Sequence, residues 1–129
     1  MTPPFPTLFS PRKVGPRTVK NRICCSAHAE AMAVDGMPAE RTVRYYELKA
    51  RGGVGFIMCW TPNANRRRDE YGGLLAHPMR FGVAVLRAVR ERVGSDFLVG
   101  VCMTGDDFHA GGLDNRACQE IAGRPTSWG

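Results

Sequence analysis

Three short apolar runs alternate along this chain with amphipathic segments of helical period. The runs occupy residues 23–27, 54–59 and 97–103. Apolar residues recur at three- and four-residue spacing in residues 39–51 and 78–93, and residues 115–122 begin a third helical segment. A strand that is apolar throughout is typical of a parallel sheet covered on both faces. The alternation therefore predicts an α/β fold with three neighbouring parallel strands and about three helices.

Proline and glycine residues predict where these elements begin and end. Gly15 and Pro16 separate two short alternating stretches within residues 7–20, which predicts a β-hairpin ahead of the first strand. Pro38 and Pro78 suit the first position of a helix, and Gly52 and Gly94 follow the predicted helix ends. In the first helix we expect Val43, Tyr46 and Ala50 to face the core and Arg44 and Glu47 to face solvent.

Cysteine and histidine spacing gives no sign of a metal site or a disulfide framework. The five cysteines lack any C-x-x-C spacing, and the three histidines lie far apart. Four of the five cysteines lie in or beside apolar runs, so we expect reduced, buried thiols. No metal-binding residue is predicted.

The formal charge of +6 favours anionic partners in general. The arginines are spread over the predicted helices and loops, however, and no aromatic platform or nucleic-acid motif accompanies them. We therefore predict no nucleic-acid partner. No apolar run approaches the roughly 18 residues of a membrane span, and the proline-rich start has no apolar core of signal-peptide type, which predicts a cytoplasmic protein without membrane contact.

The densest charge cluster lies in residues 65–73, NRRRDEYGG, within the loop and helix start at residues 61–81. A solvated loop cross-linked by surface ion pairs would account for this composition. The cluster also resembles the Asn-Arg-Arg-Thr-Asp-Glu-Tyr-Gly-Gly-Ser signature of the Old Yellow Enzyme family of NADH:flavin oxidoreductases, in the branch that contains amine dehydrogenases and 2,4-dienoyl-CoA reductases. The LFSP and KNRI segments, at residues 8–11 and 20–23, fit the same family.

The resemblance implies a (β/α)₈ barrel that binds FMN and takes electrons from NAD(P)H to act on a small-molecule substrate. Such a barrel takes about 250 residues, so this chain of 129 is expected to form only part of one. By the same resemblance, residues 1–59 match the first βαβ unit, residues 60–122 match the end of the fourth unit through strand five, and residues 123–129 form a tail. Two βα units of the family pattern are missing between them.

The resemblance also indicates which residues would contact the cofactor, since chemistry in such barrels lies at the carboxyl ends of the strands. These are Ala27, His28 and Ala29 after the first strand, Cys59 at the end of the second, and Cys102 in the strand that matches the fifth. The main chain at the first three positions would line the flavin ring. Ala29 stands where the amine dehydrogenases carry a cysteine bonded to the flavin, so FMN would be held noncovalently.

Two features depart from an active enzyme of the family. Cys102 stands where the family usually carries an arginine that stabilises charge on the reduced flavin. The family's substrate-orienting residues lie in the missing units, so no catalytic residue is predicted. From the sequence alone, His28 is better explained as an ordinary polar residue at a strand end than as a residue with a role at the flavin.

Three hypotheses remain from the sequence. The chain is a shortened member of the flavin oxidoreductase family without activity of its own. Alternatively, it is a non-enzymatic module that pairs with itself, through exposed strand edges, or with a full-length relative. The third hypothesis, a basic nucleic-acid-binding piece, requires binding that weakens steeply with salt.

Overall fold

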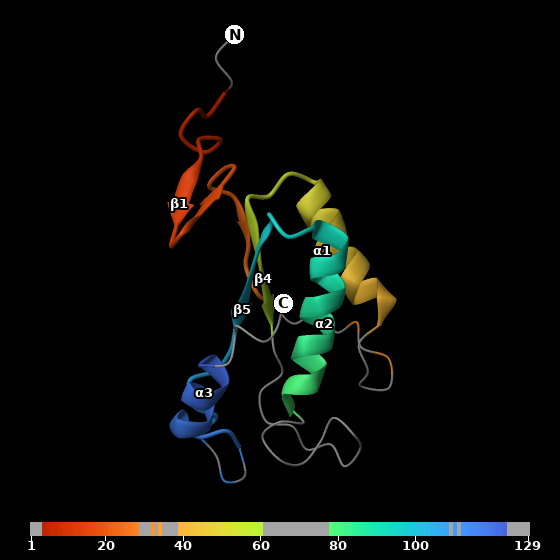
Figure 1. The fold of residues 1–129 in the computed structure, drawn as a ribbon, viewed down its shortest axis with the longest axis vertical. Helices are drawn as coiled ribbons and strands as arrows, with labels where there is room; N and C mark the ends of the chain where they lie inside the picture. The colour runs from red at the N-terminus through yellow and green to blue at the C-terminus, as the bar shows by residue number, and fades with distance from the viewer. Residues whose placement is uncertain are drawn as a thin grey trace.

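The computed structural model describes residues 4–28, 39–60, 78–108 and 112–123, together with residues 32, 34 and 110. Figure 1 shows a hairpin at one end of a small sheet, two helices along one side of the sheet, and a third helix beyond its other end. Residues 61–77, which include the charged cluster and most of the predicted loop, lie outside the described residues, as do Ala29 and Pro38.

The predicted hairpin is confirmed. Strands β1 (Arg12–Val14) and β2 (Arg17–Val19) pair antiparallel, with Arg12 opposite Val19. Gly15 lies between them with a φ of 56°, a left-handed conformation that suits glycine. Only Val19 of these two strands is buried, so the hairpin is attached to the rest of the fold mainly through β2. A hollow of about 310 Å³ separates β2 from the start of β5.

The three predicted parallel strands are confirmed as neighbours. Strands β3 (Cys24–Cys25), β4 (Phe56–Trp60) and β5 (Leu98–Cys102) form one sheet in the order β3-β4-β5. Both pairings are parallel, and β4 and β5 stay in register from Phe56 opposite Leu98 to Trp60 opposite Cys102. The strands are shorter than the apolar runs that predicted them, because apolar sequence continues into residues that make no ladder hydrogen bonds. β3 shrinks most, to two paired residues.

Asn21 fastens the short β3 to the chain that enters β4. Its side-chain amide donates to the carbonyl of Gly53 at 2.7 Å, and its Oδ1 accepts from the amide of Ile23 at 3.1 Å. The amide of Gly55 donates to the carbonyl of Ile23 at 2.7 Å. A side chain at Gly55 would place its Cβ 2.5 Å from the carbonyl oxygen of Asn21, so this approach requires glycine. Asn21 is buried, and its amide replaces ladder hydrogen bonds that β3 lacks.

Helices α1 (Glu40–Arg51) and α2 (Pro78–Val93) cover one face of the sheet (Figure 1). Their apolar stripes meet the side chains of alternate strand residues, as the predicted helical spacing requires. The helices end where predicted, at Gly52 and at Gly94, whose φ is 82°. The buried residues of this helix-covered core are Val43, Tyr46, Ile57, Cys59, Val85, Leu86 and Val89.

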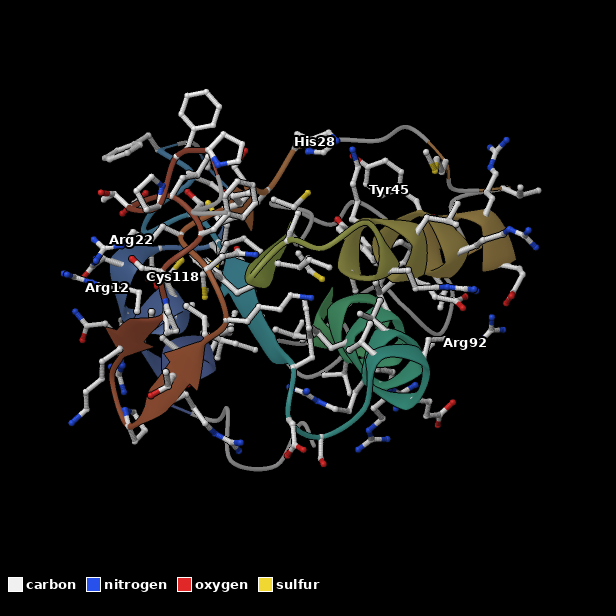
Figure 2. All side chains as sticks on the ribbon, turned by 90° about the horizontal axis from the view of Figure 1, so that it is seen from above. Arg12, Arg22, His28, Tyr45, Arg92 and Cys118 are labelled. Carbon is white, nitrogen blue, oxygen red and sulfur yellow. The ribbon has the colours of Figure 1, made fainter. Side chains whose placement is uncertain are left out.

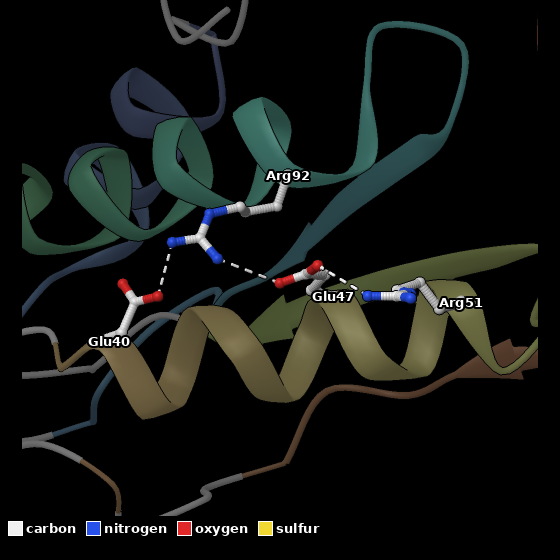
Figure 3. A network of polar contacts seen from close by, with 4 residues as sticks. All are labelled: Glu40, Glu47, Arg51 and Arg92. Carbon is white, nitrogen blue, oxygen red and sulfur yellow. Dashed lines mark hydrogen bonds and ion pairs between the residues drawn. The ribbon is translucent and has the colours of Figure 1, made fainter.

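A network of ion pairs joins the outer sides of α1 and α2 (Figure 3). The guanidinium of Arg92 in α2 lies 2.6 Å from a carboxylate oxygen of Glu40 and 3.1 Å from one of Glu47, both in α1. Glu47 also lies 3.6 Å from Arg51. The hydrogen bond to Glu40 is the main cause of a raised pKa at Arg92. The prediction that Glu47 faces solvent freely is therefore wrong, because α2 lies against that side of α1.

No described helix covers the opposite face of the sheet, which is called the open face below. Successive strand residues point to opposite faces, so Phe56 and Met58 lie on the side away from α1 and α2, where they are half-buried. Cys24 and Cys102 are exposed on the same face, which corrects the prediction of buried thiols at these positions. Cys59 and Cys118 are buried and Cys25 is half-buried, and none of the five cysteines forms a disulfide.

Helix α3 (Asn115–Ala122) forms over its predicted residues, beyond the carboxyl end of β5. Asp114 caps it, since the side-chain Oδ1 accepts from the amide of Ala117 at 2.8 Å. Cys118 and Ile121 are the buried residues of this helix. Among the described helices, none has the length and apolar character needed to cross a bilayer.

Candidate functional site

The carboxyl ends of β3, β4 and β5 meet at one edge of the sheet because all three strands are parallel. β3 leads through Ser26 and Ala27 to His28, while β4 ends at Trp60, directly opposite Cys102 of β5. Four of the predicted cofactor-binding residues therefore come to the same edge of the sheet: Ala27, His28, Cys59 and Cys102. The hollow between β2 and β5 lies at the other end of the strands, away from this edge.

His28 is held by a strand neighbour and by α1. Its Nδ1 lies 3.1 Å from the carbonyl oxygen of Ser26, and its Nε2 lies 2.7 Å from the hydroxyl of Tyr45. A carbonyl can only accept, so Nδ1 carries the proton and, in the neutral ring, Nε2 accepts from Tyr45. Figure 2 shows the two side chains facing each other between the end of β3 and α1. The His28 side chain is thus bound to α1, and its main chain is left to meet a ligand.

Cys59 and Cys102 occupy different environments, although both lie near the carboxyl ends of their strands. The Cys59 side chain is 1% exposed and packs in the helix-covered core, so only its main chain could reach a ligand at the edge. Cys102 is exposed on the open face. A thiol at this position supplies no fixed positive charge.

The loop after β5 is ordered by its own polar groups. Thr104 donates its hydroxyl to the carbonyl of Asp106 at 2.7 Å, and Asp106 Oδ1 accepts from the amide of Phe108 at the same distance. Asp107 and Leu113 exchange main-chain and side-chain hydrogen bonds at 2.9 Å. Phe108 has a φ of 54° and is 91% exposed. Hydrogen bonds within the described residues of this loop therefore shape its course after β5.

Burial and nearby carboxylates act together on Cys118, the buried thiol of α3. Desolvation raises its pKa most, and the charges of Asp107, Asp106 and Asp114 raise the pKa further. A raised pKa keeps the thiol protonated and unreactive at neutral pH, which is typical of a structural cysteine. Within the described part of the chain, no three His, Cys, Asp or Glu side chains come together as metal ligands would.

The sequence profile of the NADH:flavin oxidoreductase / NADH oxidase family matches residues 58–121, which include β4, α2, β5 and nearly all of α3. The chain belongs to this family. The family match includes the segment between β4 and α2 that carries the charge cluster, so the resemblance seen in that cluster is confirmed.

Named relatives from the curated proteins agree with this assignment. A probable N-methylproline demethylase of Rhizobium meliloti is 42% identical over 96 residues, covering 74% of this chain and 13% of its own length. An NADH oxidase of Thermoanaerobacter brockii is 30% identical over 91 residues, covering 69% of this chain and 14% of its own. This chain therefore spans a small part of these relatives.

A third relative is longer than this chain within the region that the two share. The N,N-dimethylglycine/sarcosine dehydrogenase of Chromohalobacter salexigens is 24% identical over 241 aligned positions, which take in 92% of this chain and 35% of the dehydrogenase. Because 92% of 129 residues is about 119, roughly half of those positions have no residue here. The dehydrogenase therefore carries internal sequence that this chain lacks.

A solved structure supports the predicted architecture. A 2-naphthoyl-CoA reductase, in complex with 2-naphthoyl-CoA, superposes with a TM-score of 0.58 over 88% of this chain and 21% of the reductase, at 18% identity. The fold is accordingly part of a (β/α)₈ barrel, with the three parallel strands, the helices and the N-terminal hairpin in place.

FMN and NAD(P)H are the cofactors of this family, and the described residues fit FMN in part. Ala27 is half-buried and His28 exposed after the end of β3, as a contact of this segment with a flat ring requires. Cys102 does not fit a site that stabilises negative charge on a reduced flavin. Sequence reasoning missed Tyr45, although Arg41, Tyr45 and Lys49 recur at four-residue spacing and could have indicated a polar stripe on α1.

Proposed function

We propose that this chain is the flavin-facing segment of an FMN-dependent NADH:flavin oxidoreductase and that its 129 residues alone do not complete a turnover site. The observation that carries the proposal is the carboxyl edge of the sheet, where Ala27 and His28 follow β3 and the exposed Cys102 ends β5 of the same parallel sheet. Ala29 and the main chain of Cys59 would complete the contact with the ring, and no residue is assigned a catalytic role.

The proposed organisation follows the family pattern. Residues 1–59 supply the first βαβ unit, residues 60–122 supply the end of the fourth unit through strand five, and residues 123–129 follow as a tail. The internal sequence missing relative to the dehydrogenase supports a gap between these two parts. FMN would be bound noncovalently, NAD(P)H would be the reductant of a complete barrel, and its substrate would be a small molecule in the cytoplasm.

FMN binding by the purified chain tests the proposal. Quenching of flavin fluorescence on titration, and flavin that stays with the protein through gel filtration, would support it. We expect no NADH consumption above that of free FMN. A chain that consumes NADH at an enzymatic rate would contradict the proposed lack of turnover, and a chain that leaves FMN fluorescence unchanged would contradict the flavin site.

The Cys102→Arg substitution sharpens this test. An arginine there could donate a charge-assisted hydrogen bond, worth about 1.5–3 kcal/mol, so FMN should bind roughly 10- to 150-fold more tightly. Cys24→Arg is the matched control, since Cys24 is an exposed thiol on the same face but at the opposite end of the sheet. Equal gains from both variants would point to general charge attraction instead of a flavin contact.

A second candidate function, that of a non-enzymatic pairing module, is favoured by the open face and by the outer edges of β3 and β5. Neither edge pairs with another strand among the described residues. Such edges and partly exposed apolar faces promote association with a second copy or with a relative.

Light scattering over a range of protein concentrations tests self-association, with a mass above that of the monomer expected as concentration rises. Leu98→Lys on the open face should return the protein to a monomer. Leu48→Lys is its control, because Leu48 is 54% exposed on α1. A monomer at every concentration would contradict this function.

A further inference from the structure

One polar stripe on α1 contacts two residues of the connection that follows β3. Arg41, Tyr45 and Lys49 lie four residues apart, so they share one side of the helix. Arg41 donates from Nε to the carbonyl of Met32 at 2.6 Å, and Tyr45 contacts His28 at 2.7 Å. Two points of the connection between β3 and α1 are thus bound to the helix it leads into.

The Tyr45 ring is itself held in place from two sides. It meets the ring of Tyr46 edge to face, with centroids 5.3 Å apart, and Tyr46 is 1% exposed in the helix-covered core. The ammonium of Lys49 lies 5.1 Å from the Tyr45 ring centroid, within the range of a cation–π contact. The hydroxyl that reaches His28 therefore starts from a ring anchored to buried structure.

The His28 ring receives this constraint at both nitrogens. Ser26 fixes the proton on Nδ1, and Tyr45 occupies Nε2. The two rings also meet edge to face, with centroids 5.6 Å apart. Because both ring nitrogens are hydrogen-bonded, the backbone at His28 loses much of its conformational freedom.

We propose that Tyr45 is a positioning residue, which holds the His28 ring and the main chain of residues 27–28 in the conformation that meets a flavin ring. The identity of the ligand in this inference rests on the proposed function. The geometry is independent of that function, because it consists of the contact between Tyr45 and His28. Tyr45 acts through His28 and is not assigned a contact with the cofactor.

The Tyr45→Phe variant tests this, because it removes one hydroxyl and keeps the ring. In the ¹⁵N-labelled chain without flavin, His28 should show a protonated Nδ1 and a bare Nε2. In the variant the Nδ1 proton should stay with Ser26, the Nε2 resonance should move because it loses its partner, and the amide resonances of residues 27 and 28 should broaden or move. Unchanged amide resonances at residues 27 and 28 would overturn the proposal.

FMN titration adds the functional readout. Losing one hydrogen bond of ordinary strength should weaken FMN binding roughly 2- to 10-fold in Tyr45→Phe. His28→Gln should weaken binding by a similar factor, and the double variant should lose little more than either single one, because both remove the same contact. Leu48→Ala, which alters an exposed side chain of the same helix, should change neither readout.

The two readouts separate this inference from the proposed function. Unchanged FMN affinity in Tyr45→Phe, measured against a wild-type chain that binds FMN, would overturn the positioning role and leave the flavin site standing. A wild-type chain that fails to bind FMN would overturn the flavin site, and the amide resonances of residues 27 and 28 would still decide whether Tyr45 holds this segment in place.

Discussion

The two faces of the parallel sheet differ in how far this chain can complete them. On the face covered by α1 and α2, Ile57 and Val89 have no exposed surface and Tyr46 has 1%. On the other face Cys24 and Cys102 are exposed, and Phe56 and Met58 are half-buried. Helices that follow their own strands cover one face locally, whereas the interior of a barrel needs side chains from strands all round the ring. The described residues therefore contain the outer, helical layer of the barrel segment, whereas the face that would point into the barrel has no described layer over it.

The largest expected effect is a difference in the free energy of unfolding between substitutions at two neighbouring residues of β4. Ile57→Ala should lower the free energy of unfolding by about 2–5 kcal/mol, because it leaves a cavity in the helix-covered core. Met58→Ala, on the open face, should cost at most about half as much, because its side chain is only partly removed from water. Urea unfolding followed by circular dichroism measures both. Equal costs would mean that the open face is packed in solution.

Thiol reactivity compares the same two faces without changing the apolar core. Cys24 and Cys102 should react with a disulfide reagent at the rate of free thiols. Cys59 and Cys118 should react at least about 100-fold more slowly, because they need an opening that costs about 3 kcal/mol. Mass spectrometry after timed quenching identifies the modified residues.

The pH dependence of the same reaction has a defined sign for Cys118. Its pKa is raised by burial, so it stays protonated at a pH where an ordinary thiol of pKa about 8.5 is half ionised. Its reaction should therefore accelerate at higher pH than that of an ordinary small-molecule thiol. Because the unfolded thiol ionises first, Cys118 stabilises the fold fully below the ordinary thiol pKa. This contribution falls as the pH rises from there through the raised pKa. A reaction profile for Cys118 that overlaps that of the small-molecule thiol would show that α3 does not bury its thiol.

A smaller effect is expected at the join between β3 and β4. Asn21→Ala removes two side-chain hydrogen bonds and leaves the carbonyl of Gly53 and the amide of Ile23 without this partner. The expected cost is about 1–3 kcal/mol, measured by urea unfolding. Asn21→Asp keeps the acceptor for Ile23 but sets a buried carboxylate oxygen against the carbonyl of Gly53, so at neutral pH it should cost at least as much as Asn21→Ala. A variant as stable as the wild type would show that β3 needs no side-chain support.

The smallest effect should come from the exposed side of the helical layer. Arg92→Gln removes the ion pairs with Glu40 and Glu47, which solvent screens because Arg92 is 43% exposed. The melting temperature should fall slightly in dilute buffer and match that of the wild type near 1 M salt, where the Debye length is about 3 Å. A difference that persists in high salt would assign the effect to packing of the arginine stem.

The elements of this fold were predictable wherever local sequence decides them. Helical spacing with Pro78 and Gly94 predicted the bounds of α2, and residues 115–122 were predicted as helical and form α3. Gly15 and Pro16 predicted the hairpin. Strand ends were less predictable, because an apolar run continues past the residues that find ladder partners, as at β3. Exposure was wrong for Cys24, Cys102 and Glu47, since each depends on which element lies opposite, and composition does not specify that.

The site followed the same division. Parallel strands predict that the flavin-facing residues meet at one edge of the sheet. The structure brings Ala27, His28, Cys59 and Cys102 to the carboxyl ends of three neighbouring strands. The hydrogen bond between His28 and Tyr45 joins residues 17 positions apart on different elements. It depends on how α1 rotates against the sheet, which no local pattern specifies.

The in-register pairing of β4 with β5 has a consequence for engineering. A further strand could add to the outer edge of β5 in the same direction, with its crossover helix beside α2, without disturbing the pairs already formed. Grafting units from a longer relative onto the carboxyl end of α3 would then regrow the ring one repeat at a time. The length at which flavin is first retained would measure how much of the circle the cofactor requires.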